Sequence, residues 1–180
     1  MSKKLRLLCL SAMFLTIGLL LPFITMQIPE IGKMLCPMHL PVMLCGLICG
    51  WKYGLAVGFI TPLLRSVLFQ MPALYPSAVG MAFELAAYGV SIALIYSLFK
   101  KKNIAAVYGS LIPAMIIGRL VWGVARTVML GLSGPETASF SFTYFLTSGF
   151  VEAIPGLILQ LILIPVIMEA LWRAKVIKRK

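Results

Sequence analysis

The sequence predicts an all-α integral membrane protein, folded as a compact six-transmembrane-helix bundle with both termini in the cytoplasm. Three observations predict this fold: the apolar composition, the number of long apolar runs, and the placement of the basic residues. Of the 180 residues, 61% are hydrophobic and only 12% are charged, and the mean hydropathy is +1.03. Ordinary water-soluble domains are far less apolar. We therefore expect one transmembrane domain over residues 1–180.

The apolar runs are interpreted as helices. Backbone polar groups cannot stay unpaired in hydrocarbon, so only helices and closed barrels span membranes. The runs lack the alternation that is typical of barrel strands. A helix needs about 20 mainly apolar residues to cross the bilayer. Six spans are expected near residues 6–26, 37–50, 54–70, 77–99, 104–130 and 144–172.

The basic residues indicate how the spans are oriented. With six spans, nearly all lysines and arginines outside the spans fall on one side of the membrane, and Lys33 lies in an opposite loop. Alternatively, the second and third spans form one helix through Lys52, which leaves five. Five spans would separate the basic start from the basic tail, against the preference of basic loops for the cytoplasm. We therefore expect six spans and two cytoplasmic termini.

Small residues recur where the second and third spans meet. Glycines follow one another every four residues, at Gly46, Gly50, Gly54 and Gly58. Such a pattern lets helices approach closely in lipid, and we interpret it as packing. The four cysteines lie in or beside apolar runs without the paired spacing of a metal site. We interpret them as small buried apolar residues.

Several classes of function are excluded by composition and motifs. The formal charge of +11 could suggest nucleic acid, but the basic residues cluster between apolar runs instead of along a polar face. The sequence has no nucleotide-binding G-x-x-x-x-G-K-S/T motif, no H-E-x-x-H motif and no aspartate. We expect no nucleic-acid partner, no cofactor, no metal and no catalysis. Any ATP hydrolysis would belong to partner subunits.

Ionisable side chains inside the predicted spans are the candidate functional residues. Each costs at least about 2.5–3.5 kcal/mol to insert, so each needs a partner, a water-lined cavity or a function. Six such residues fall within the spans. They are His39, Arg65, Glu84, Arg119, Arg126 and Glu152.

The predicted depth of these groups points to a pocket. The histidine and the glutamates lie in the first turns of inward-running spans, and the arginines lie from the middle to the outer ends of outward-running spans. Arg119 and Arg126 are about 10 Å apart along one helix, with Trp122 between them. Tyr88 and Trp122 could stack on a flat ring. We predict an outward-facing binding pocket for a small polar ligand.

Three alternatives remain open for these residues. The two glutamates could pair with the arginines of the fifth span as internal struts, without any ligand. Arg65 could extend to the outer lipid headgroups. His39 could be an interfacial residue at the start of its span.

Four stretches carry a resemblance to a known family. They are Pro37-Met-His-Leu-Pro-Val, Leu44-Cys-Gly-Leu-Ile-Cys-Gly-Trp-Lys-Tyr-Gly-Leu-Ala-Val-Gly-Phe, Met81-Ala-Phe-Glu-Leu-Ala-Ala-Tyr-Gly and Gly118-Arg-Leu-Val-Trp-Gly. With six short spans and a polar pocket in the outer half, the chain resembles a substrate-binding subunit, or S-component, of an energy-coupling factor (ECF) transporter. The resemblance covers essentially the whole chain.

This resemblance implies partners and a location. It implies a multi-pass protein of the cell membrane that works with a transmembrane scaffold subunit and two ATPase subunits. In such a complex the S-component topples in the membrane and delivers a small water-soluble vitamin inward. The family docks through an alanine-x-x-x-alanine motif in its first helix, and the closest match here joins Ala12 to Thr16. Threonine replaces the second alanine but is also small.

The ligand and the energy source leave alternatives. The arginines suit pantothenate or another carboxylate, whereas the glutamates, His39 and the aromatic rings suit a vitamin B6-type or hydroxymethylpyrimidine-type ring. The rival function is a stand-alone ion-coupled secondary transporter, in which Glu84, Glu152 and the arginines relay protons. That rival usually carries paired broken helices in two related halves, and the sequence shows no such halves.

Overall fold

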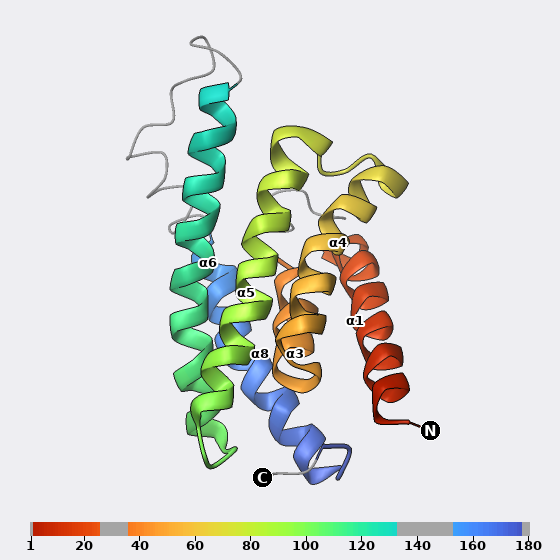
Figure 1. The fold of residues 1–180 in the computed structure, drawn as a ribbon, viewed down its shortest axis with the longest axis vertical. Coiled ribbons are helices and arrows are strands. Elements are labelled where there is room, and N and C mark those ends of the chain that lie inside the picture. The colour runs from red at the N-terminus through yellow and green to blue at the C-terminus, as the bar shows by residue number, and fades with distance from the viewer. Residues whose placement is uncertain (1, 26–35, 133–152, 178–180) are drawn as a thin grey trace.

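The computed structural model describes residues 2–25, 36–132 and 153–177, and in these ranges it is helical with no strand (Figure 1). The helices are α1 (Lys3–Thr25), α3 (His39–Cys49), α4 (Trp51–Phe69), α5 (Val79–Leu98), α6 (Ile104–Leu132) and α8 (Ile154–Arg173). A short segment, η1 (Leu74–Ala78), precedes α5, and Tyr75 within it has extended backbone angles, φ −121° and ψ 135°. Within the described ranges, five helices are long and apolar enough to cross a membrane, and α3 is shorter. The prediction of an all-α membrane protein is confirmed.

The α3 and α4 helices form a tight hairpin that turns at a single residue. Gly50 has φ +94° and ψ 175°, a conformation that favours glycine because it has no Cβ. The chain therefore reverses between Cys49 and Trp51, and the two helices pack side by side (Figure 1). This arrangement rules out one continuous helix through Lys52. It also moves the start of the third predicted span, because α4 begins at Trp51 and not at 54.

Glycines let three helices meet at their backbones. A Cβ atom added at Gly54 would lie 2.6 Å from the carbonyl oxygen of Gly89 on α5, and one added at Gly58 would lie 2.5 Å from that of Leu85. A Cβ at Gly46 on α3 would also lie 2.6 Å from the Gly89 oxygen. Three of the four predicted glycines therefore pack helices together, and the fourth makes the turn.

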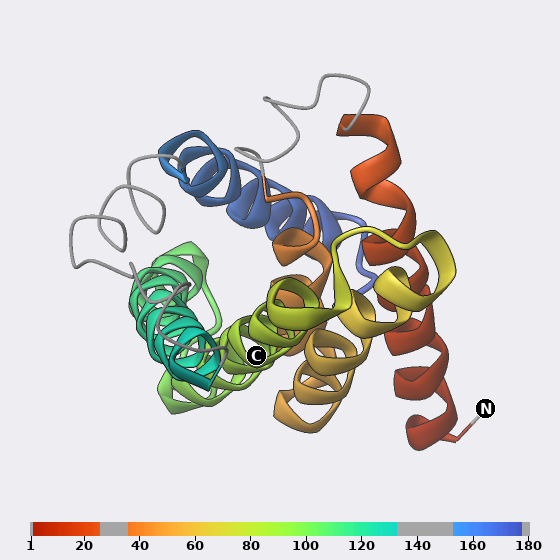
Figure 2. The ribbon, with the colours of Figure 1, turned by 90° about the horizontal axis from the view of Figure 1, so that it is seen from above.

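The short α3 helix lies at the centre of the bundle. It packs against α1, α4, α5 and α8, and the view from above shows it among the longer helices (Figure 2). Most of its side chains are buried. The outer faces of the longer helices expose large apolar residues, such as Leu98 and Val67 at 79% and 70%. An apolar exterior of this kind suits a protein surrounded by lipid.

The two ends of the described chain lie at the same end of the bundle (Figure 1). Nη2 of Arg6 in α1 donates a 3.0 Å hydrogen bond to the carbonyl oxygen of Val176, just after α8. This placement agrees with an even number of membrane passes. The side of the membrane on which this end lies stays a prediction. Of the predicted sixth span, residues 144–152 lie outside the described ranges.

Candidate substrate-binding site

The site is built around one carboxylate that joins three helices. His39 is the first residue of α3, Glu84 lies on α5, and Arg119 lies on α6. Oε1 of Glu84 is 3.1 Å from Nη1 of Arg119 and 3.3 Å from Nε2 of His39. All three residues are buried, at 2% exposure for His39 and Glu84 and 5% for Arg119. A buried charge is stable only when paired and hydrogen-bonded, and this cluster meets that condition for Glu84.

The segment before α3 connects this cluster to α8. Nη2 of Arg119 lies 3.7 Å from Sγ of Cys36, and Nε2 of Gln160 on α8 donates a 3.5 Å hydrogen bond to the Cys36 carbonyl oxygen. Cys36 has φ +45°, a left-handed conformation that residues other than glycine seldom adopt. Cys36, just before α3, and Gln160, on α8, thus extend the cluster to a fourth helix.

Tyr88 supplies an aromatic wall one turn after Glu84 on α5. Its side chain is fully buried, and its ring meets the His39 ring edge-on with centroids 5.1 Å apart. A Cβ atom added at Gly118 would lie 2.5 Å from Cζ of Tyr88, so glycine leaves the space in which the ring lies against α6. The ring therefore packs between α3 and α6, beside the charged pair.

Four buried polar atoms of this cluster have no hydrogen-bond partner in the described part of the chain. They are Nδ1 of His39, Oη of Tyr88, Nε of Arg119 and Oε1 of Gln160. A buried polar atom that stays unpaired costs about 1–3 kcal/mol, so proteins rarely leave several together. Such atoms are expected where a polar ligand completes the hydrogen bonding. We name the residues Cys36, His39, Glu84, Tyr88, Arg119 and Gln160 the central cluster.

Arg126 and Trp122 lie further along α6. Nη1 of Arg126 is 3.4 Å from Oγ of Ser77 in η1, and the Tyr75 hydroxyl donates a 2.7 Å bond to the carbonyl oxygen of Met129. The half-buried Arg126 therefore contacts the segment before α5 and not Glu84. Trp122 is partly buried between the two predicted arginines.

Arg65 contacts a different set of residues. Its Nη1 donates a 2.8 Å bond to the carbonyl oxygen of Leu19 in α1, and its guanidinium lies 5.0 Å from the Phe23 ring centroid and 5.9 Å from that of Phe69. It is 3% exposed, so it packs between α1 and α4 and does not extend outward. Glu152, the last predicted site residue, lies outside the described residues.

The structure therefore brings together four of the eight predicted site residues, His39, Glu84, Tyr88 and Arg119, and adds two that sequence reasoning missed. From the sequence, Cys36 is expected to be a small buried apolar residue, and Gln160 carries no charge, so the cost of inserting a charge in lipid does not identify it. A single amide within the apolar run of α8 was the available signal for Gln160. The cluster suits binding more than catalysis, because two cationic or donor groups already hold the one carboxylate.

Comparison with known proteins assigns the chain to a family. The family model described as "ECF transporter, substrate-specific component" matches residues 6–168, a range that begins in α1 and ends in α8. No curated protein and no solved structure shows significant similarity to the chain. Together with the five helices of the described ranges that are able to span a membrane, the match makes this a multi-pass membrane protein. The chain belongs to the family of substrate-specific components of ECF transporters.

Proposed function

We propose that the central cluster is the site at which this subunit captures a small water-soluble vitamin or vitamin precursor. The subunit takes the ligand outside the cell and delivers it inward together with a scaffold subunit and two ATPase subunits. Membership of the ECF family supports the role in transport. The unpaired polar atoms of the central cluster carry the assignment of the site.

The same atoms argue against a purely structural role for the charges. A structural strut should satisfy its own hydrogen bonds, because a partly satisfied polar network is less stable than an apolar core. Here Glu84 is satisfied, but Arg119, His39, Tyr88 and Gln160 each keep an unpaired atom among the described residues. A ligand with both donors and acceptors would pair with them.

The arrangement favours a polar ring over an anion. Arg119 is already neutralised by Glu84 at 3.1 Å, so an anionic ligand gains less there than it would from a lone guanidinium. Tyr88 and His39 offer aromatic surface beside the unpaired Oη and Nδ1 atoms. A vitamin B6-type or pyrimidine-type compound is therefore our first candidate, and pantothenate is the second. Arg126, Trp122 and Glu152 remain proposed ligand contacts outside the central cluster, whereas Arg65, whose guanidinium contacts α1, is proposed to stabilise the fold.

The exposed face of α1 is the proposed docking surface for the scaffold subunit. Ala12 and Thr16 are both exposed, one turn apart, and the Thr16 hydroxyl donates a 3.0 Å bond to the Ala12 carbonyl oxygen. This bond satisfies the hydroxyl within the helix, so the face presents two small side chains. Small residues at this spacing let another helix approach closely in lipid.

Native mass spectrometry of the gently purified protein tests the ligand class. We expect a co-purified small molecule, and titration with the two candidate classes then ranks their affinities. Reconstitution tests the mechanism. The purified subunit alone, in liposomes, should bind the vitamin without accumulating it under a proton gradient. Accumulation by the subunit alone would favour the secondary-transporter alternative.

A further inference from the structure

A groove of about 370 Å³ separates the start of α1 from the end of α8. The α1 helix packs on α3 and α4, whereas α8 packs on α6 and α3, so the two helices share α3 as a neighbour. Arg6 bridges the opening through its 3.0 Å bond to the Val176 carbonyl oxygen. The groove therefore lies at the end of the bundle that holds both ends of the described chain (Figure 1).

The lining of the groove is basic at the rim and apolar below it. The rim carries Lys3, Arg6 and Lys175, and no acidic side chain is among the lining residues in the described ranges. The apolar part is formed by Leu7, Leu10, Met13 and Phe14 of α1, Ile48 of α3, Leu171 near the end of α8, and Val176 and Ile177 just after α8. A free anion would use the rim alone, whereas an amphipathic anion would use both parts.

The length of the groove matches one leaflet of a bilayer. Lys3 and Phe14 are eleven residues apart, which is about 16 Å along a helix. Half of the hydrocarbon core of a bilayer is about 15 Å. A headgroup beside Lys3 would therefore place its acyl chain along α1 down to Phe14.

We propose that this groove binds one anionic phospholipid. Its phosphate lies among Lys3, Arg6 and Lys175, and one acyl chain follows the apolar face of α1 past Leu7 and Leu10. Basic residues close to a membrane surface attract anionic headgroups in this way. The proposal requires a protein inserted in a membrane and does not depend on which vitamin the central cluster binds.

The lipid groove and the proposed docking face lie on opposite sides of α1. At 100° per residue, Lys3, Leu7, Leu10 and Phe14 share one side of the helix, and Ala12 and Thr16 point roughly the other way. The exposure of Ala12 and Thr16 and the burial of Phe14 agree with this geometry. A bound lipid would therefore contact the side of α1 opposite to the docking face and would leave Ala12 and Thr16 uncovered.

Titration of the detergent-solubilised protein with phosphatidylglycerol, followed by native mass spectrometry, tests the proposal. Phosphatidylcholine serves as the lipid without net charge. The Lys3→Gln/Lys175→Gln variant keeps the Arg6 bond but removes two rim charges. We expect it to bind phosphatidylglycerol about 30-fold more weakly, which converts to about 2 kcal/mol.

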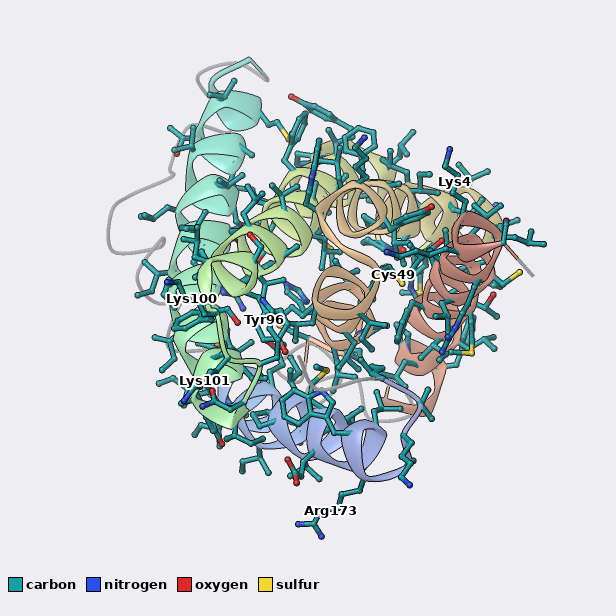
Figure 3. All side chains as sticks on the ribbon, turned by 60° about the horizontal axis from the view of Figure 1, so that its bottom comes forward. Lys4, Cys49, Tyr96, Lys100, Lys101 and Arg173 are labelled. Atoms are coloured by element: carbon teal, nitrogen blue, oxygen red, sulfur yellow. The ribbon has the colours of Figure 1, made fainter. Side chains whose placement is uncertain are left out.

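A matched control removes two charges elsewhere at the same end. Lys100 and Lys101 follow α5 and lie away from α1 (Figure 3), so Lys100→Gln/Lys101→Gln should leave lipid affinity unchanged. A groove-filling variant, Leu10→Trp, keeps every charge and should also lower the affinity, while thermal unfolding confirms that each variant is folded. Equal affinity of the wild type and the rim variant would overturn the proposal. So would equal binding of both lipids.

Discussion

Replacing Tyr88 with phenylalanine removes one buried oxygen from the central cluster and keeps the ring that packs against His39 and Gly118. In the ligand-free protein this oxygen has no hydrogen-bond partner among the described residues, so its loss should stabilise the fold by about 1 kcal/mol. For a chain of this size that gain raises the melting temperature by about 2–4 °C. In the complex, the hydroxyl should bond the ligand. Loss of a bond worth about 0.5–1.5 kcal/mol weakens binding about 2- to 13-fold.

Thermal unfolding of the ligand-free protein and equilibrium titration with the co-purified vitamin measure the two effects separately. Tyr108→Phe is the matched control, because Tyr108 is 38% exposed near the start of α6 and far along that helix from Gly118. It should change neither quantity. A Tyr88→Phe variant with lower stability and unchanged affinity would show instead that the hydroxyl serves the fold and not the ligand.

Three further variants test the packing of Tyr88, the role of Arg65 and the docking face of α1. Gly118→Ala places a methyl group against the Tyr88 ring, so it should cost about 1–3 kcal/mol of stability and also weaken vitamin binding. Unchanged vitamin binding would show that the position of the Tyr88 ring does not affect the ligand. Arg65→Lys loses the guanidinium contacts between α1 and α4, and we expect lower thermal stability with nearly unchanged affinity; a large loss of affinity at constant stability would instead place Arg65 in the site. Ala12→Leu/Thr16→Leu should block co-purification with the scaffold subunit while vitamin binding persists, and intact complex formation would exclude this docking face.

The features that could be predicted from the sequence follow from the cost of burying polar groups in lipid. Long apolar runs require helices, and ionisable residues inside them require partners. These two rules predicted the helices and the buried positions of Glu84, Arg119 and His39, which the structure joins through one carboxylate oxygen. The packing of the glycines at 46, 54 and 58 followed from the small-residue pattern in the same way.

The features that could not be predicted depend on how each helix is rotated about its axis. Depth alone placed Arg65 with the other arginines, but its position on α4 directs it toward α1 and the Leu19 carbonyl oxygen. Gln160 and Cys36 carry no charge, so the free-energy cost of inserting a charged group in the bilayer could not identify them. The turn at Gly50 depends on its positive φ angle. The four-residue spacing of the glycines could not distinguish this turn position from the positions where glycine packs helices together.

Arg119 and its neighbours are proposed to form the vitamin site of this ECF substrate-specific component. Native mass spectrometry of the wild type and of Arg119→Ala, purified side by side under the same gentle conditions, tests this assignment. We predict a bound small molecule in the wild type and its loss from the variant, with the variant still folded by thermal unfolding. A variant that retains the same bound molecule would contradict the claim.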